Sequence, residues 1–250
     1  MTVDADWIAP QWPAPSRVRA TCTTRAGGVS TGPYESLNLG DHVGDGAQEV
    51  ETNRKKFAER IGAHPVFLRQ VHGHKTIEID GSTPDGIEAD AAFTRVQGLA
   101  CTVMVADCLP VLFALRDGSA VAAAHAGWRG LLGGVLESAL AALGARDGNE
   151  IVTWMGPCIG PRAFEVGADV KRAFEEADAS HSRFFAPHAP GKFLADLPGL
   201  ARARLAAAGV TGIHGNDGSD AWCTVANASR FFSHRRDRVS GRLAAAVWLD

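Results

Sequence analysis

The segment from Leu99 to Trp128 constrains the fold more than any other part of the chain, because it consists of apolar, strand-like runs separated by short turns. Asp117-Gly118 lies between two of these runs, and Asp-Gly in that position is a strong hairpin signal, since both residue types tolerate positive φ. The sequence therefore predicts an antiparallel hairpin at this point. The three apolar runs span residues 99–105, 110–115 and 119–125.

The register of this hairpin brings two metal-binding side chains together. A two-residue turn pairs Arg116 with Ser119 and so places Pro110 opposite His125. Cys108 lies just before the strand that Pro110 opens, a position at which proline is tolerated. Facing residues of an antiparallel pair lie about 4.5–5.5 Å apart at Cα. We therefore expect the Cys108 thiol and the His125 imidazole to reach the same ion.

His72 is the third candidate ligand, because it directly follows another β-like run, 66–71. Three protein ligands leave a tetrahedral zinc ion one open position, as catalysis requires, whereas structural sites usually close with four. The spacing matches no zinc-finger pattern, and each residue taken alone fits an ordinary buried cysteine or a hydrogen-bonded histidine. His74 would share a strand face with His72 and is an alternative ligand. We predict His72, Cys108 and His125 as metal ligands and catalytic residues.

The chain after His125 has the features of an anion-binding turn. Gly127 and Gly130 allow the backbone to approach a ligand closely, and apolar residues then recur at helical spacing from 131 to 143, with Gly144 as the stop. A helix N-terminus favours anions, and the Arg129 guanidinium suits phosphate or carboxylate. Gly127 and Arg129 are therefore predicted substrate-binding residues, although a packed Trp128 and a solvated Arg129 fit equally well.

Two further regions contain candidate site residues. The glycine-rich segment 25–46 is too long for a passive connection, so Arg25 and Asn38 are predicted to line a substrate pocket; the alternative is a surface flap. Asp107 precedes Cys108 and could accept a hydrogen bond from a ligand histidine. A structural hydrogen bond at the turn is the other interpretation of Asp107.

Composition limits the class of protein. The chain has 250 residues and a net charge of −3, without a basic block, which argues against a nucleic-acid partner. It shows neither a signal-peptide pattern nor an apolar run long enough to cross a membrane. Five scattered cysteines suit a reducing compartment rather than a disulfide framework. We therefore expect a cytoplasmic protein without a membrane partner.

The order of predicted elements favours an α+β fold. We expect one domain over 1–250, with an extended N-terminal arm over 1–16, because no composition break or repeat divides the chain. Strands that come in hairpins, with helices interspersed, indicate mixed sheets rather than a doubly wound parallel sheet. Further strands are predicted at 18–24, 151–155, 221–225, 229–234 and 243–249, the last in a central position, and further helices at 48–61, 170–177 and 197–208.

Several motifs in a fixed order resemble the YfiH-like family, whose members are described as laccase-domain or multicopper polyphenol oxidase proteins and as purine nucleoside-metabolising enzymes. Besides the three ligand segments, the matching motifs are Thr24-Arg25-Ala26-Gly27-Gly28-Val29-Ser30, Ser36-Leu37-Asn38-Leu39-Gly40, Val43-Gly44-Asp45, Asn53-Arg54, Gly156-Pro157-Cys158-Ile159-Gly160-Pro161 and Phe231-Phe232-Ser233-His234-Arg235-Arg236.

The resemblance implies a fold and an activity. The fold would be a single-domain layered sandwich of mixed β-sheets covered by helices. Zinc would be held by His72, Cys108 and His125, and adenosine, inosine and methylthioadenosine would be cleaved by phosphate, with adenosine deamination as a second activity. The partners would be purine nucleosides and phosphate, and the protein would be a monomer or homodimer.

Three other functions remain open at this point. Some relatives are described as peptidoglycan editing factors, and Cys108 with His125 could form the nucleophile pair of such a hydrolase or amidase. Copper oxidase chemistry is less well supported, because the chain has nine histidines and one His-x-His pair. A purely structural zinc ion would need a fourth ligand, such as His74 or Cys158.

The chain departs from the family pattern at three positions. Ala226 stands where the family usually has a second cysteine after Cys223, and His234 and Phe164 stand where tyrosine is common. These departures remove a cysteine pair and a phenol from the expected site, but they leave the three proposed ligands unchanged.

Overall fold

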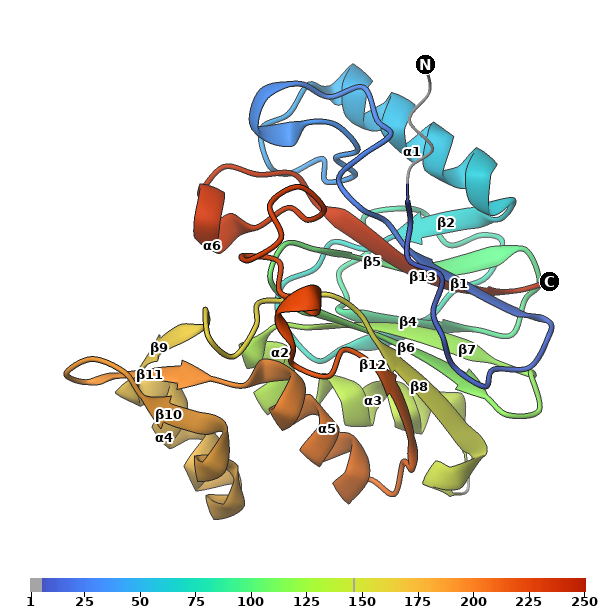
Figure 1. The fold of residues 1–250 in the computed structure, drawn as a ribbon. Helices are drawn as coiled ribbons and strands as arrows, with labels where there is room; N and C mark the ends of the chain where they lie inside the picture. Colours follow the sequence, from blue (N-terminus) through green and yellow to red (C-terminus); the bar gives the residue numbers. More distant parts are fainter. Residues whose placement is uncertain (1–5, 146) are drawn as a thin grey trace.

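Two β-sheets stacked face to face form the centre of the protein (Figure 1). The computed structural model describes residues 6–145 and 147–250. One sheet has the strand order β1-β13-β5-β2 and the other the order β12-β8-β6-β7-β4-β3. Their strands are β1 (Val18–Cys22), β2 (His64–Phe67), β3 (Thr76–Glu78), β4 (Ala91–Thr94), β5 (Leu99–Val105), β6 (Leu109–Leu115), β7 (Val121–Ala126), β8 (Ile151–Met155), β12 (Gly212–Gly215) and β13 (Leu243–Leu249).

Helices cover the outer faces of both sheets, which gives four layers (Figure 1). A small third sheet, β10-β11-β9, projects from one corner beside α4. The helices are α1 (Ala47–Ile61), α2 (Trp128–Gly133), α3 (Val135–Leu143), α4 (Ala168–Ala177), α5 (Leu197–Ala207) and α6 (His234–Asp237), and the small sheet contains β9 (Glu165–Gly167), β10 (Phe185–Pro187) and β11 (Lys192–Ala195). The predicted α+β sandwich of mixed sheets covered by helices is confirmed.

Strand β13 is apolar throughout because both of its faces are buried. Ala245 and Val247 pack into the core between the two sheets, whereas Ala244 and Ala246 face the layer that contains Phe57 of α1. A strand buried on both faces needs no polar alternation. The predicted central position of this strand is confirmed, since it lies between β1 and β5.

The central hairpin has the predicted register, with Pro110 opposite His125. Its turn is longer than predicted. Leu115 donates its N–H to Ala120 O, but Arg116 donates its N–H to Glu150 O instead of pairing with Ser119. Gly118 has φ +73°, which is the left-handed conformation that an Asp-Gly turn supplies. The register therefore holds because the apolar faces determine it, although the loop closes differently.

The predicted continuous helix after Gly127 is wrong, because the chain breaks at Gly134 into α2 and α3. Gly134 has φ +94°, and its N–H bonds to the carbonyls of Gly130 and Leu131. Leu131 and Leu136 on either side of the break are both fully buried. The break thus lets two short helices place apolar residues on the same sheet face.

Other elements differ from the prediction at their ends. The strand predicted over 66–71 ends at Phe67. The predicted strand 221–225 is a 3₁₀ turn, Asp220–Trp222, followed by a compact turn in which the Asn227 amide donates to the carbonyls of Asp220 and Cys223. The predicted strand 229–234 gives way to α6, which the Ser233 side chain caps.

The N-terminal arm is described only in part. Residues 1–5 of the predicted 1–16 arm lie outside the described residues, and the remainder joins the sheet through a bridge between Ile8 and Cys22. Within the ranges 6–145 and 147–250, none of the helices is both long and apolar enough to cross a membrane.

Candidate metal centre and active-site pocket

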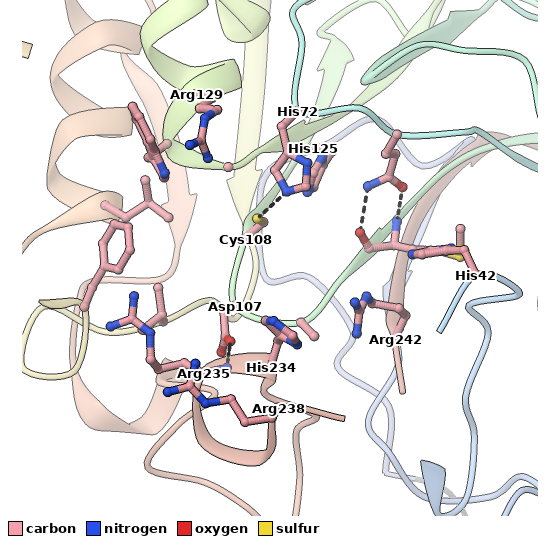
Figure 2. Close-up of a pocket in the computed structure, with 18 residues that line it drawn as sticks. His42, His72, Asp107, Cys108, His125, Arg129, His234, Arg235, Arg238 and Arg242 are labelled. Atoms are coloured by element: carbon pink, nitrogen blue, oxygen red, sulfur yellow. Dashed lines mark hydrogen bonds between the residues drawn. The ribbon is translucent and has the colours of Figure 1, made fainter. Parts of the chain in front are cut away.

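The side chains of His72, Cys108 and His125 converge at one end of the six-stranded sheet (Figure 2). One ligand atom from each residue lies within 4.8 Å of the others. Cys108 Sγ is 3.6 Å from His72 Nε2, and the two imidazole rings lie 4.8 Å apart at an angle of 72°. Two imidazole nitrogens and one thiolate at this separation can bind one metal ion and leave a coordination position open.

Two of these candidate ligands are positioned by a left-handed backbone conformation, at His72 itself and at the residue before Cys108. His72 has φ +61°, and Asp107, directly before Cys108, has φ +89°. Left-handed backbone is unfavourable for residues other than glycine and persists where surrounding contacts impose it, often at functional sites. His125, in contrast, lies in regular β7 and is held by the hairpin register.

Asp90 holds the two histidine ligands in place. Its Oδ1 lies 2.8 Å from His125 Nδ1, and its two carboxylate oxygens also accept the backbone N–H groups of Val71, His72 and Gly73. A carboxylate on Nδ1 keeps the proton there and directs the Nε2 lone pair at the metal position. Asp90 is fully buried directly before β4, so its contact with His125 is shielded from water.

Gly127 leaves the space that the ligands occupy. A Cβ at this position would lie 2.8 Å from His72 Cδ2 and 2.9 Å from Cys108 Sγ. Real Cβ atoms do not approach other atoms so closely. Glycine is therefore required at the first residue after β7, because any side chain would displace a ligand.

The electrostatics of the cluster favour a thiolate. Burial alone would raise the pKa of Cys108, but His125 and then His72 outweigh it and lower the pKa to about 6. Burial would likewise lower the pKa of His125, yet the Cys108 charge and the Asp90 hydrogen bond raise it to about 9. In the metal-free protein at neutral pH, Cys108 is therefore an anion beside an imidazolium, and a thiolate is the form that binds metals.

The two alternative ligands from the sequence lie elsewhere. His74 is exposed and its ring lies against Gly133 of α2. Cys158 is fully buried, and its Sγ contacts Ile159 O and the Asn216 amide. In the part of the chain that the structure describes, the candidate metal-binding group consists of His72, Cys108 and His125 only.

The candidate metal-binding cluster opens into a pocket with a volume of about 500 Å³, within the usual range for small-molecule sites. One part of its wall is apolar and aromatic, from Trp128, Ile159, Phe164 and Leu197. The lining also contains four arginines and one carboxylate, Asp107. The basic residues of the lining, which Figure 2 labels, are Arg129, Arg235, Arg238, Arg242, His42 and His234.

The structure brings only two of the four predicted substrate-binding residues to this pocket. Gly127 and Arg129 line it. The Arg25 guanidinium instead donates to the carbonyls of Glu35 and Ala228, and Asn38 is fully buried. Arg25 and Asn38 therefore support the loop that carries them and are outside the pocket lining.

The suggested contact of Asp107 with a ligand histidine is wrong. Both of its oxygens bind other groups: Oδ1 accepts from the Thr224 hydroxyl and Oδ2 from the Arg235 N–H. Asp90 makes the contact instead, although it is distant in sequence from the hairpin ligands. The alternative interpretation, a structural hydrogen bond at the turn, is the correct one for Asp107.

Sequence reasoning missed Asp90 and three of the pocket arginines. The signal for Asp90 was a single acidic residue directly before a buried strand, and charged residues in such a place are rarely buried unless paired. Arg235 lies within the Phe231-Phe232-Ser233-His234-Arg235-Arg236 motif and Arg238 and Arg242 follow it, but the motif alone does not indicate a binding role. Only the fold shows that this C-terminal segment reaches the hairpin ligands.

Comparisons with known proteins fit this geometry. Residues 19–250 match the family model described as multi-copper polyphenol oxidoreductase laccase. A Pseudomonas aeruginosa protein named purine nucleoside phosphorylase is 52% identical over 98% of both chains. The Escherichia coli purine nucleoside phosphorylase YfiH is 49% identical over 97% of this chain and 98% of its own. The chain belongs to the YfiH-like family.

Solved structures show that the YfiH-like fold extends over the whole chain. A Neisseria meningitidis protein superimposes with a TM-score of 0.92 at 46% identity, covering 98% of this chain and 99% of its own. YlmD from Geobacillus stearothermophilus superimposes with a TM-score of 0.91 at 30% identity, covering 100% and 97%. The four-layer arrangement around the metal-binding cluster is thus the YfiH-like fold.

Proposed function

We propose that this YfiH-like protein is a zinc-dependent purine nucleoside phosphorylase acting on adenosine, inosine and methylthioadenosine. One observation carries the proposal: a candidate three-ligand metal cluster opens into a pocket that is lined by both apolar side chains and arginines. A purine nucleoside offers a flat, weakly polar surface, and phosphate offers two negative charges. The names of the two bacterial relatives at 52% and 49% identity support the same activity.

Zinc is the metal that best fits this donor set. Zinc binds both histidine nitrogen and cysteine sulfur, and its catalytic sites have three protein ligands; the Gly127 gap and the Asp90–His125 contact both fit a bound ion. Copper oxidases need further histidine-rich sites. Among the described residues, the single three-ligand group does not supply them. When bound, zinc would act as a Lewis acid toward a substrate oxygen or nitrogen.

The pocket residues can carry out the steps of phosphorolysis. A phosphate oxygen forms a bond to the ribose C1′ atom, the C1′–N9 bond breaks, and the base leaves with that electron pair and takes up a proton. The arginines bind the negatively charged phosphate through charge-assisted hydrogen bonds. The apolar wall around Phe164 and Leu197 packs on the nucleoside and excludes water. Adenosine deamination at the same site is the second proposed activity.

The direct test is phosphate-dependent release of hypoxanthine from inosine by the purified, zinc-loaded protein. We expect turnover that requires both phosphate and metal, with ribose 1-phosphate as the second product. Adenosine should give adenine by the same route and inosine by deamination. Release of base at the same rate without phosphate would contradict phosphorolysis.

A second candidate function is a cysteine-dependent hydrolase that edits a peptidoglycan precursor. The thiolate–imidazolium character of Cys108 and His125 favours it, because such a pair is a nucleophile in the absence of metal. The two functions respond oppositely to chelation. A hydrolase of this kind keeps its activity on a serine-bearing muropeptide after metal removal, whereas the phosphorylase loses activity.

A further inference from the structure

We propose that Arg242 is a phosphate-binding residue of the pocket and that the buried Asn38 amide positions it. This inference rests on the proposed function and names the residues that give it phosphate affinity. In Figure 2 the Arg242 side chain points from the C-terminal segment toward the middle of the pocket. The test below measures phosphate binding directly, so that it does not depend on turnover.

Arg242 is fixed by one side of its guanidinium group. Its Nη1 donates to Ser240 O at 3.0 Å, Gly241 O at 3.1 Å and the Ser240 hydroxyl at 3.4 Å. No residue that the structure describes accepts a hydrogen bond from Nε or Nη2 of Arg242. An arginine held through one nitrogen presents its other edge in a fixed direction, which suits bidentate binding of an oxyanion and loses little entropy when the anion binds.

Two of the other pocket arginines lie against aromatic rings. Arg129 is exposed and stacks over Trp128 at 4.3 Å, without a hydrogen-bond partner among the described residues. Arg235 is also held through Nη1, which donates to Glu165 O at 3.1 Å and Ala163 O at 3.5 Å, but it lies over Phe164 at 5.6 Å, toward the apolar wall. Burial lowers the pKa of Arg242, whereas the nearby Cys108 and Asp107 charges raise it, so its guanidinium group lies within the electrostatic reach of the metal ligand.

Asn38 fixes the backbone that carries Arg242. Asn38 Oδ1 accepts the Arg242 N–H at 2.8 Å and the Gly40 N–H at 2.9 Å, and its Nδ2 donates to Gly40 O and to Asp45 Oδ2. Leu39 in turn donates its N–H to Arg242 O. Asn38 is fully buried and its two hydrogen bonds to Gly40 are shielded from water, so losing the amide would leave buried groups unpaired.

Gly40 supports the Arg242 side chain from the same loop. A Cβ at Gly40 would lie 2.7 Å from Arg242 Cγ, and the backbone there has no positive φ. A Gly40→Ala change therefore leaves the Asn38 bonds possible but displaces the arginine side chain. This gives a second way to disturb Arg242 that does not depend on Asn38.

The experiment is calorimetric titration of inorganic phosphate into the zinc-loaded protein, together with inosine kinetics at varied phosphate. We expect Arg242→Ala to weaken phosphate binding at least 100-fold, and Asn38→Ala and Gly40→Ala to weaken it about 10-fold. The KM for inosine and kcat at saturating phosphate should stay within about twofold for Asn38→Ala and Gly40→Ala. Asn38→Ala added to Arg242→Ala should cause no further loss, because both act through one group.

Asn53→Ala is the matched control. Asn53 is also fully buried and anchors the same loop, through Ser30 Oγ, Ser36 O, Asn38 O and the Val29 N–H, but it makes no contact with Arg242. It should lower the Tm as much as Asn38→Ala does and leave phosphate affinity within about twofold.

The results separate this inference from the proposed function. Wild-type protein that binds phosphate through Arg242 but does not cleave inosine refutes the function and keeps the inference. Unchanged phosphate affinity in Arg242→Ala overturns the inference even if the enzyme is a phosphorylase. An equal loss of affinity in Asn38→Ala and Asn53→Ala shows that Asn38 is only structural. If Asn38→Ala does not fold, Gly40→Ala decides whether the position of Arg242 matters.

Discussion

At the scale of single residues, Asp90 distinguishes this site from a chance cluster of two histidines and a cysteine. One buried carboxylate accepts hydrogen bonds from His125 Nδ1–H and from three consecutive backbone N–H groups of the His72 loop. It therefore connects two ligands that lie on different segments. Such a shared hydrogen-bond acceptor is not expected if the three side chains lie together by chance.

We expect Asp90→Asn to weaken zinc binding by about 10–100-fold, because loss of the carboxylate frees both the His125 ring and the His72 loop. Competition with a chromophoric chelator measures the affinity. Asp107→Asn is the matched control: its oxygens bind Thr224 and Arg235, and asparagine tolerates its positive φ. Equal losses of affinity in the two variants would show that Asp90 has no special role.

Cys108 should be much more reactive than three of the buried cysteines. The pKa of Cys108 near 6 lies below the ordinary thiol value, so its thiolate fraction rises as the pH passes 6 and is nearly complete above pH 7. In the native metal-free protein, the rate of iodoacetamide labelling should therefore level off by about pH 7, and zinc should block it. Cys22, Cys101 and Cys158 should stay unlabelled, because burial raises their pKa.

A labelling rate at Cys108 that keeps rising to pH 9, as for a free thiol, would contradict the charge assignment. Peptide mass spectrometry locates the label, and Cys108→Ser provides the blank. If a buried cysteine were labelled earlier than Cys108, the protein would have unfolded at least locally.

At the scale of elements, the sequence predicted those whose apolar residues decide their position. β5, β8, β13, α1 and the hairpin register follow from such patterns. It failed where local hydrogen bonds made by polar side chains decide the outcome. Ser233 caps α6 and Asn227 folds the preceding turn, so the predicted strands 221–225 and 229–234 do not form. Periodicity carries no information about such contacts.

A different limit applies to the site, where the missing information is long-range. The hairpin register predicted that Cys108 and His125 would meet, because it is a local property. Arg242 and Asp90 could not be placed in this way, since each reaches the site from a distant part of the chain. The glycine-rich loop predicts Asn38 as a pocket residue. The structure shows instead that Asn38 accepts a hydrogen bond from the backbone N–H of Arg242, which lines the pocket.

The break between α2 and α3 gives a test at this scale. Gly134 has φ +94°, so Gly134→Ala should lower the free energy of unfolding by more than about 1 kcal/mol. Its neighbour Gly133 lies within α2, and a Cβ there meets only an ordinary contact, 3.5 Å from His74. Gly133→Ala should therefore raise stability by up to about 1 kcal/mol. Urea unfolding of both variants measures the difference, and equal effects would refute the left-handed break.

At the scale of the whole molecule, the four layers bring separate segments to one end of the six-stranded sheet. The loop after β2 supplies His72, the central hairpin supplies Cys108 and His125, and the chain between α6 and β13 supplies Arg242. The two sheets and their covering helices hold these segments rigidly, because both sheets are buried on their two faces. The pocket thus depends on the complete sandwich.

The metal content of Cys108→Ala protein tests the central claim most directly. Wild-type protein, purified without chelators, should contain close to one zinc ion per chain by elemental analysis. Cys108→Ala should contain almost none, and it should lose phosphate-dependent cleavage of inosine while keeping the wild-type circular dichroism spectrum. Stoichiometric zinc in the Cys108→Ala protein would show that His72, Cys108 and His125 are not the ligands.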